Sequence, residues 1–325
     1  MKKLELNSTH YRFLMSKFEE WMKIENYKSN TVISYTNTLN EFFFFLQCNS
    51  VNNIKLVEQK DYVFFKNHLM NRTHELDDLK NLKNITINCI LKSVNCFVKH
   101  FNELNPHSAI DIYIEFLPVD TEERVVLTED EILRIYDATF EINSYNRIAF
   151  GQRDRAIIAA LYGCGLRRTE ASMLDIGDID FHNKRIHVRH GKFGKQRFVP
   201  IAPKNLEDLR AYIQHGRDWF RYHQNNASIY NPKLKDVPVQ DRDALFLNLF
   251  GTRMKCFQHR IDKMVQVAMI EKRVSHHIFR HSVATHLLMK GVELDKIADF
   301  LGHSSIDSTQ IYTHIINQLN EEENV

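Results

Sequence analysis

A short segment near the C-terminal end of the chain, residues 275–281, constrains its fold more than any other feature of the sequence. The segment reads Ser-His-His-Ile-Phe-Arg-His and opens a run that continues with apolar residues at helical spacing as far as Met289. His277 and Arg280 are three residues apart, so a helix over this run presents both on one face. We therefore predict a helix from His277 to about Met289 that buries one side in a core and carries a basic pair on another.

A second segment, residues 301–314, follows shortly after and reads Leu-Gly-His-Ser-Ser-Ile-Asp-Ser-Thr-Gln-Ile-Tyr-Thr-His. Gly302 is a typical residue to end a helix, because glycine adopts the left-handed conformation of a helix C-cap without steric cost. His303 and Tyr312 then follow that helix. We predict that the two segments meet at one end of a helical domain.

Two stretches upstream supply further basic side chains. Residues 165–170 read Gly-Leu-Arg-Arg-Thr-Glu, which places Glu170 one turn after Arg167. Residues 189–197 read Arg-His-Gly-Lys-Phe-Gly-Lys-Gln-Arg, and the apolar residues that flank them predict a β-hairpin with Lys192 near its tip. Residues 183–206 contain no Asp or Glu. The hairpin is thus either a solvated basic loop or a contact for phosphate groups, for which the candidate residues are Arg189, Lys195 and Arg197.

The composition is that of an ordinary globular protein with room for two domains. Of 325 residues, 43% are hydrophobic and 26% are charged. The chain has neither the run of roughly 18 apolar residues that spans a bilayer nor the apolar core of a signal peptide, so we expect a cytoplasmic protein. The odd number of cysteines and the absence of a CxxC pair predict unpaired, buried thiols in a reducing compartment: Cys48, Cys89, Cys96, Cys164 and Cys256.

The chain divides into two helical regions. Apolar and aromatic residues recur at helical spacing through residues 1–105, where we interpret the aromatic stripes as core. A proline and several acids interrupt the pattern in residues 106–125, which we predict to be a linker. The sequence Thr-Glu-Asp-Glu from Thr128 is typical of a capping box that opens the second domain, residues 126–325. Residues 223–243 are rich in Asn and Pro and predict a loop.

Metal and nucleotide cofactors are not expected. His277 and His281 have the i, i+4 spacing of helical zinc ligands, but HExxH is absent and no acid nearby in sequence completes a ligand set. The glycine-rich motifs of nucleotide-binding loops are absent as well. A tyrosine at the position of Tyr312 is more often a packing residue, and only neighbouring cations would make its phenol a useful nucleophile.

Taken together and in this order, six residues resemble the catalytic set of the tyrosine recombinases, the phage integrase family: Arg167, Lys192, His277, Arg280, His303 and Tyr312. The resemblance covers most of the chain and is strongest from Asp154 to His314. It implies a mainly α fold, with an N-terminal helical (SAM-like) core-binding domain and a mostly helical catalytic domain with a small β-sheet, which form a C-shaped clamp on DNA.

The resemblance also implies a role for each residue. Tyr312 would be the nucleophile, forming a 3′-phosphotyrosine and releasing a 5′-hydroxyl. Arg167 and Arg280 would bind the scissile phosphate, and Glu170 would orient Arg167. Lys192 would act as general acid, with Lys195 as its rival. The remaining pair, His277 and His303, would assist with hydrogen bonds and proton transfer.

The implied enzyme is a site-specific recombinase without cofactors. Its partners would be double-stranded DNA with an inverted-repeat site and three further copies of itself, in a tetramer that passes through a Holliday junction. The chain begins almost directly with the core-binding helices, which is typical of Xer-like or mobile-element recombinases rather than of lambda-like integrases. Two alternatives are a type IB topoisomerase, which has the same chemistry, and a non-catalytic DNA-binding protein with the same fold.

Overall fold

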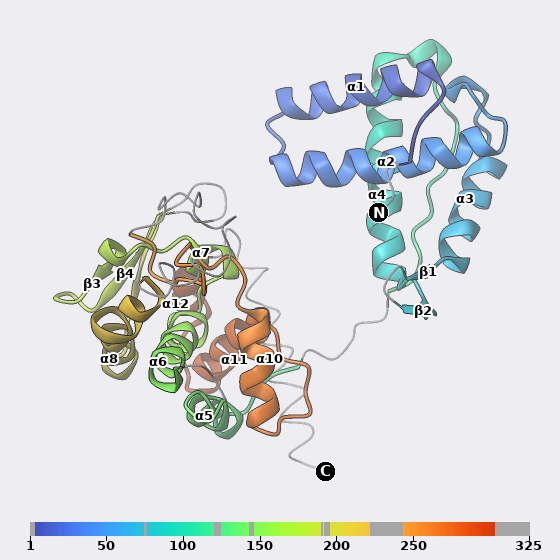
Figure 1. Ribbon diagram of the computed structural model, residues 1–325. Helices are drawn as coiled ribbons and strands as arrows, with labels where there is room; N and C mark the ends of the chain where they lie inside the picture. The colour runs from blue at the N-terminus through green and yellow to red at the C-terminus, as the bar shows by residue number, and fades with distance from the viewer. Residues whose placement is uncertain are drawn as a thin grey trace. The chain divides into compact units, whose positions relative to one another are not determined.

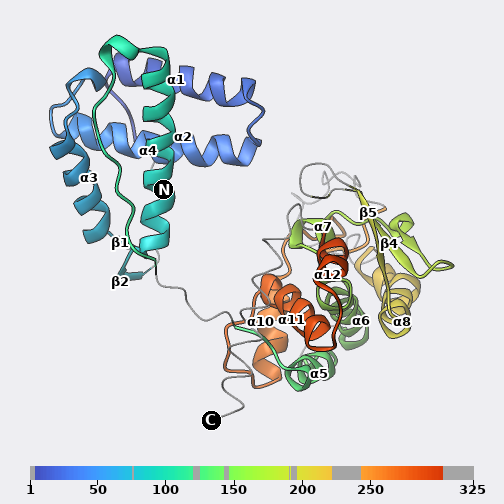
Figure 2. The same ribbon diagram turned by 180° about the vertical axis from the view of Figure 1, so that it is seen from behind.

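The computed structural model describes residues 4–74, 77–119, 125–142, 146–189, 191, 196–221 and 243–302. The chain divides into two compact units, residues 1–122 and residues 123–325, each of which has its own hydrophobic core (Figures 1 and 2). Within the described ranges, no helix is long and apolar enough to cross a membrane.

The first unit is built around four helices. Its elements are α1 (Thr9–Ile24), α2 (Ser29–Cys48), a 3-10 helix (Ile54–Leu56), α3 (Gln59–Asn71), a hairpin of β1 (Thr73–His74) and β2 (Asp77–Asn81), α4 (Asn84–Leu104) and a second 3-10 helix (Pro106–Ser108). The aromatic stripes form the core, as predicted: the rings of Phe18 and Phe43 both meet Phe97 edge-on, at 5.5 and 5.2 Å between centroids. The hairpin was not predicted, because residues 72–81 contain only two apolar side chains.

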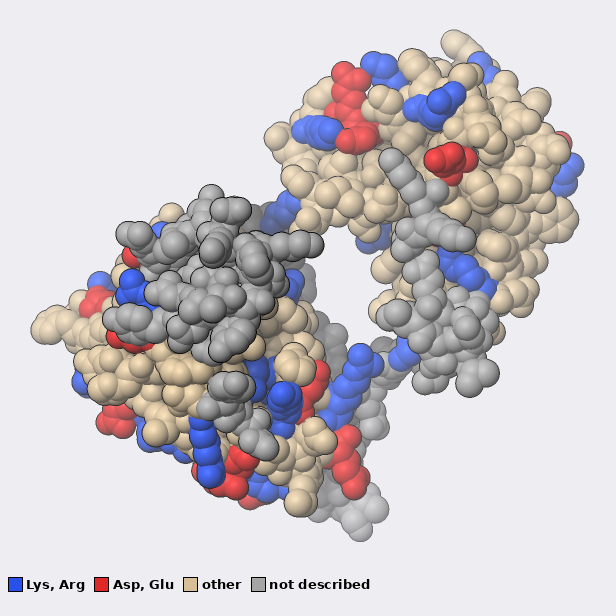
Figure 3. Space-filling model, viewed as in Figure 1, with Lys and Arg blue, Asp and Glu red and all other residues tan. Residues whose placement is uncertain are grey.

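Both signs of charge are spread over the visible face of this unit, and neither forms a continuous patch there (Figure 3).

Residues 109–119, within the segment that we expected to link two domains, lie along the first unit. Side-chain amides hold this segment: Asn88 donates to the carbonyl of Leu117 and accepts from its N–H, both at 2.8 Å. Asn102 brackets Ile110 in the same way, at 3.0 and 2.7 Å. An extended segment has no hydrogen bonds within itself. These amides therefore supply hydrogen-bond partners for its backbone N–H and carbonyl groups where they are shielded from water.

The second unit combines helices with a small antiparallel sheet, which confirms the predicted fold class. Its helices are α5 (Glu129–Ala138), α6 (Arg147–Ile158), α7 (Arg168–Ser172), α8 (Pro203–Ala211), α10 (Gln258–Val267), α11 (His276–Met289) and α12 (Leu294–Leu301). The sheet has the order β3 (Ile179–Asp180), β4 (Arg185–Val188), β5 (Arg197–Pro200). The predicted hairpin corresponds to β4 and β5, whose register pairs buried Ile186 with buried Val199.

Two predicted helix boundaries are confirmed in this unit. The capping box at α5 forms, since Thr128 Oγ1 accepts from the N–H of Glu131 at 3.1 Å and the Glu131 carboxylate accepts from the N–H of Thr128 at 2.8 Å. Gly302 ends α12 in the left-handed conformation, with φ 64°. Helix α11 packs against α12 and the π-helical turn Ala159–Gly163.

The cysteines are unpaired, as predicted, but the expectation that they are all buried was wrong. Cys164 is buried, whereas Cys48, Cys89 and Cys256 are exposed. Cys48 is the last residue of α2 and Cys89 is on the solvent-facing side of α4, so neither position reaches a core.

A buried ion pair joins α6 to α10. The Arg260 guanidinium donates from Nε to both oxygens of Asp154, each at 3.1 Å, and from Nη2 to the same carboxylate. Asp154 has no solvent exposure, and only 5% of Arg260 is exposed. Removing one member of such a pair leaves the other as an uncompensated buried charge.

We expect Asp154→Asn to lower the free energy of unfolding of the second unit by about 3 to 5 kcal/mol, because Arg260 would lose its counter-charge. The matched control is Asp130→Asn, which removes an exposed i, i+4 pair with Arg134 and should cost no more than about 0.5 kcal/mol. Urea unfolding of both variants measures the difference. Equal midpoints for the two would show that the buried pair contributes nothing particular.

Candidate active site

The predicted site is organised around one carboxylate, that of Glu170. Helix α7 begins immediately after Arg167, and Glu170 folds back on that first turn. Its Oε2 accepts from the Arg167 N–H at 2.9 Å, and its Oε1 accepts from Arg167 Nη1 at 2.7 Å. The predicted pairing of these two residues is therefore present, with the carboxylate on the inner side of the helix N-terminus.

Two more guanidinium groups approach the same carboxylate from other elements. Arg197, on β5, donates from Nη1 and Nη2 to the two oxygens of Glu170, both at 3.0 Å. Arg280, on α11, has its Nη1 4.0 Å from Glu170 Oε2. We call Arg167, Arg197 and Arg280 the arginine cluster. The Glu170 side chain is 1% exposed, so the attraction within this group is weakly screened by water.

The charge balance keeps Glu170 ionised. Burial by itself would raise the pKa of its carboxyl, but the hydrogen bonds and charges of Arg197 and Arg167 outweigh it and lower the pKa to about 2. A buried anion thus sits permanently beside three cations at neutral pH. It holds the guanidinium groups together while leaving the cluster with net positive charge.

The arginine cluster also caps the C-terminal end of α12. Arg197 Nε donates to the carbonyl of Phe300 at 3.3 Å, Arg280 Nη2 to that of Leu301 at 2.6 Å, and Arg167 Nη2 to that of Gly302 at 2.9 Å. The last carbonyls of a helix lack partners within it and carry its negative dipole end, so cations are favoured there. Elements far apart in sequence (α7, β5, α11 and α12) therefore meet at one point (Figure 2).

Gly165 makes the close approach of α12 possible. Its backbone has φ +56°, and a Cβ at this position would lie 2.8 Å from Leu301 Cδ2 and 2.9 Å from Phe300 Cε1. Its carbonyl also accepts a hydrogen bond from Arg280 Nη1. The glycine that precedes the predicted arginine motif thus serves packing between the loop before α7 and the end of α12.

His277 lies one helical turn before Arg280 on α11, as predicted. Burial lowers the pKa of its imidazole, and the charges of Arg280, Arg168 and Arg167 lower it further. At neutral pH the ring is therefore uncharged and has one donor and one acceptor nitrogen. The ring of His276 lies beside it, tilted by 46° with 4.4 Å between ring centroids, and burial lowers the pKa of His276 to about 4.

The structure thus brings together four of the residues predicted to take part in or support catalysis: Arg167, Glu170, His277 and Arg280. Arg197, which we expected to contact DNA, lies in the arginine cluster with 14% of its side chain exposed. Arg189, which we also expected to contact DNA, pairs with Asp175 at 2.5 Å and with Asp178 at 2.8 Å. Four predicted residues lie outside the described ranges: Lys192, Lys195, His303 and Tyr312. Most of the predicted loop, residues 223–243, lies outside them too.

Sequence reasoning missed the network that holds Arg189. Asp175 accepts from Arg253 as well as from Arg189, and Arg253 Nη1 donates to the carbonyls of Ser172 and Leu174 at 3.1 and 2.9 Å. The network ties the end of β4 to the loop after α7. No local pattern could have indicated it, because Arg253 lies 78 residues from Asp175.

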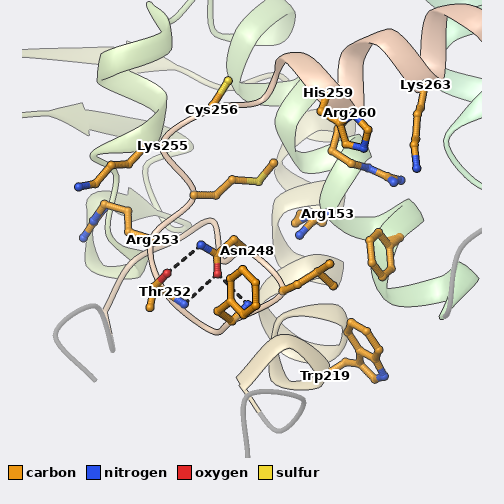
Figure 4. Close-up of a pocket in the computed structure, with 14 residues that line it drawn as sticks. Arg153, Trp219, Asn248, Thr252, Arg253, Lys255, Cys256, His259, Arg260 and Lys263 are labelled. Carbon is orange, nitrogen blue, oxygen red and sulfur yellow. Dashed lines mark hydrogen bonds between the residues drawn. The ribbon is translucent and has the colours of Figure 1, made fainter. Parts of the chain in front are cut away.

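A cavity of about 950 Å³ lies between α6, α10 and the loop formed by residues 248–256 (Figure 4). Asn248 shapes this loop, since its amide donates to Thr252 Oγ1 at 2.7 Å and accepts from the N–H of Phe250 at 2.8 Å. Among the described residues that line it there is no Asp or Glu. Its basic members are Arg153, Arg253, Lys255, His259, Arg260 and Lys263. Across the described part of the chain, no three His, Cys, Asp or Glu side chains are grouped to hold a metal ion.

Comparison with known proteins decides the family. The model of the phage integrase family matches residues 125–318. The chain is 30% identical to the tyrosine recombinase XerC of Anoxybacillus flavithermus over 93% of both chains. It is 32% identical to the XerC of Oceanobacillus iheyensis over 92% of this chain and 90% of that protein. The chain belongs to the phage integrase family.

Solved structures agree on the fold. The XerH site-specific recombinase bound to palindromic difH substrate matches with a TM-score of 0.67 and 19% identity, over 99% of this chain and 98% of that one. The Tn1549 transposon integrase in complex with circular intermediate DNA matches with a TM-score of 0.64 and 20% identity, over 92% and 94%. Family and enzyme class are thus those that the sequence predicted, a tyrosine-type site-specific recombinase, and the alternatives are not favoured.

We expect Glu170→Gln to make the free energy of unfolding depend less on pH below about pH 4.5. Because the pKa of Glu170 in the folded state, about 2, lies below its ordinary 4.5, the unfolded chain binds more protons between these values. Folding stability from this group is therefore complete above about pH 4.5 and is lost as the pH falls toward 2. Between about pH 5 and about pH 3, the free energy of unfolding of wild type should fall by on the order of 2 kcal/mol more than that of the variant. Urea unfolding at the two pH values measures both decreases. Parallel profiles would contradict the role of the carboxylate.

Proposed function

We propose that this protein cleaves and rejoins double-stranded DNA at a specific site, with Tyr312 as nucleophile. The observation that carries the proposal is the arginine cluster: two of its members, Arg167 and Arg280, are the residues assigned to the scissile phosphate. They come from different elements and are held by one buried carboxylate. The only described carboxylate there is balanced by three guanidinium groups, so the site favours a further anion.

The chemistry follows from these groups. The phenolic oxygen of Tyr312 gives up its proton to one of the two neutral histidines, His277 or His303, and attacks the scissile phosphorus. The bond from phosphorus to the 5′ oxygen breaks, and a 3′-phosphotyrosine forms. Lys192 delivers a proton to the departing 5′ oxygen. Arg167 and Arg280 stabilise the added charge of the pentacoordinate transition state, because guanidinium groups match phosphate oxygens in geometry and remain protonated. The phosphotyrosine conserves the bond energy, and attack by a 5′-hydroxyl of another strand rejoins the DNA.

The histidines would act as neutral groups. Since burial and the neighbouring arginines lower the pKa of His277, its ring adds no charge at neutral pH and can exchange a proton or a hydrogen bond with the phosphate or the attacking phenol. His303 follows directly after Gly302, whose carbonyl Arg167 holds at 2.9 Å. We assign His303 the same kind of supporting role.

The wider assembly is proposed from the family. A core-binding domain over residues 1–105 and a catalytic domain over residues 126–325, joined by residues 106–125, would close around one DNA duplex. Four copies would bring two inverted-repeat sites together and exchange strands through a Holliday junction, in the cytoplasm. Arg189 and Lys195 would contact the DNA backbone.

We expect wild-type protein to form a covalent adduct with a nicked suicide duplex in the presence of a metal chelator, because two arginines replace a metal in stabilising the phosphate. Tyr312→Phe should form none, since phenylalanine has no nucleophilic oxygen. Denaturing gel electrophoresis with end-labelled DNA measures the adduct and shows that the protein is joined to the 3′ phosphate.

A matched control is Tyr113→Phe, because Tyr113 is an exposed tyrosine of the first unit, with 76% of the residue accessible. It should form the adduct at the wild-type rate. An adduct that survives in Tyr312→Phe would sink the assignment of the nucleophile. A supercoiled plasmid without a recombination site separates the enzyme classes, since a topoisomerase would relax it and a site-specific recombinase would leave it supercoiled.

We also infer that the basic cavity wall contributes to DNA binding through Lys263. If Lys263 neutralises one phosphate, Lys263→Gln should reduce the slope of log K against log salt concentration by about 0.9. Lys290→Gln, which removes an exposed lysine paired with Glu129 on the same unit, should leave the slope unchanged. Equal slopes for wild type and Lys263→Gln, measured by fluorescence anisotropy over a salt series, would show that Lys263 makes no phosphate contact.

A further inference from the structure

One side chain of the arginine cluster, that of Arg197, contacts three elements at once. It begins β5, donates to both oxygens of Glu170 at 3.0 Å, and donates from Nε to the carbonyl of Phe300 at 3.3 Å. All three nitrogens of its guanidinium therefore have acceptors within the protein. The side chain is 14% exposed, and its bidentate contact with Glu170 sets it apart from Arg280, whose Nη1 lies 4.0 Å from that carboxylate.

We propose that Arg197 is a positioning residue for the cleavage reaction, which sets the orientation of Arg167 through Glu170 and fixes the end of α12 from which the chain continues to His303. The inference rests on the proposed function, because it gives Arg197 a task in the chemistry of Arg167 and Tyr312. It replaces a direct contact between Arg197 and the DNA backbone by an action through a neighbouring side chain.

The geometry requires arginine at this position. A guanidinium is a rigid fork that spans both oxygens of one carboxylate and still has Nε available for a third acceptor. A lysine ammonium is a point charge on a flexible stem, and it would reach one of these acceptors at a time. If Glu170 loses Arg197, only Arg167 still donates hydrogen bonds to its carboxylate, at 2.9 Å from the N–H and 2.7 Å from Nη1. We expect the carboxylate to be less firmly oriented, and Arg167, which depends on the same two oxygens, to shift with it.

Gly302 shows how closely Arg197 lies against the end of α12. A Cβ at Gly302 would be 2.7 Å from Nη1 of Arg197 and 2.8 Å from its Cζ. The guanidinium therefore packs against the bare Cα of the residue that precedes His303. The carbonyl of the same glycine accepts from Arg167. Arg197 and Arg167 thus hold Gly302 from its Cα side and its carbonyl side.

Arg197 also connects this site to the predicted hairpin tip. The general-acid candidates Lys192 and Lys195 come shortly before it in sequence, and β5 starts at Arg197. The side chain that holds Glu170 is therefore on the strand that leaves the hairpin tip.

The test compares Arg197→Lys and Arg197→Gln with wild type in the full-length protein. The probe is a nicked duplex of the sequence that wild type selects from a randomised pool. We expect both variants to bind it with a Kd within about 2-fold of wild type and with an unchanged salt slope. At saturating protein, adduct formation should be about 10- to 100-fold slower, the scale of loss expected when a catalytic group is misplaced by about 1 Å.

Two results would overturn the proposal. A salt slope reduced by about 0.9 in Arg197→Gln, which removes the charge, together with weaker binding would make Arg197 a phosphate contact. Adduct formation at the wild-type rate in both variants would show that the cluster is positioned without it. The failure of wild type itself to form the adduct would instead overturn the proposed function, so the two failures are distinguishable.

A second pair of variants separates positioning from a general loss of stability. Gly302→Ala introduces a methyl group against the Arg197 guanidinium, whereas Gly291→Ala imposes a similar left-handed strain, at φ +79°, with no atom within 4 Å of the new Cβ. We expect slow adduct formation only in Gly302→Ala. Combined with Glu170→Gln, Arg197→Lys should add little further loss, because both act on one contact. Independent, multiplying losses would contradict an action through Glu170.

Discussion

The second unit depends on one buried carboxylate. Glu170 is the meeting point of a helix N-terminus, a strand and a long core helix, through Arg167, Arg197 and Arg280. Three guanidinium groups would repel one another if no anion lay between them, and a carboxylate in apolar surroundings would take up a proton if no cation lay beside it. The carboxylate offsets the repulsion between the guanidinium groups, and the guanidinium groups keep the carboxylate ionised. This mutual compensation explains why charged groups can be buried at this point of the core.

The same arrangement links stability to chemistry. The arginines that are assigned to the DNA phosphate already hold the carbonyl end of α12 and the carbonyl of Gly165. Their positions are therefore set by the fold before substrate arrives, which lowers the entropic cost of organising the transition state. A site of this kind is preorganised because its members also serve as helix caps and core contacts.

Much of this could be predicted from sequence, and the exceptions have physical causes. The capping box at Thr128, the helix end at Gly302 and the hairpin of β4 and β5 depend on neighbours in sequence, and all three are present. The position of Arg197 was not foreseen. A basic residue on a hairpin without acids indicates a contact with phosphate, whereas its counter-ion, Glu170, lies 27 residues away. The attachment of residues 109–119 to the first unit depends on asparagine amides, which carry no periodic signal.

The glycine of the Leu-Gly-His motif has a meaning beyond its backbone angle. Any larger residue at Gly302 would have to adopt a left-handed conformation and also displace the Arg197 guanidinium. Two independent constraints thus select the same residue, one from a helix end and one from a side chain on a distant strand. The glycine of this motif therefore reflects the space that the Arg197 side chain occupies, in addition to the histidine that follows it in sequence. A chain with another residue at this place should be examined for a smaller partner on β5.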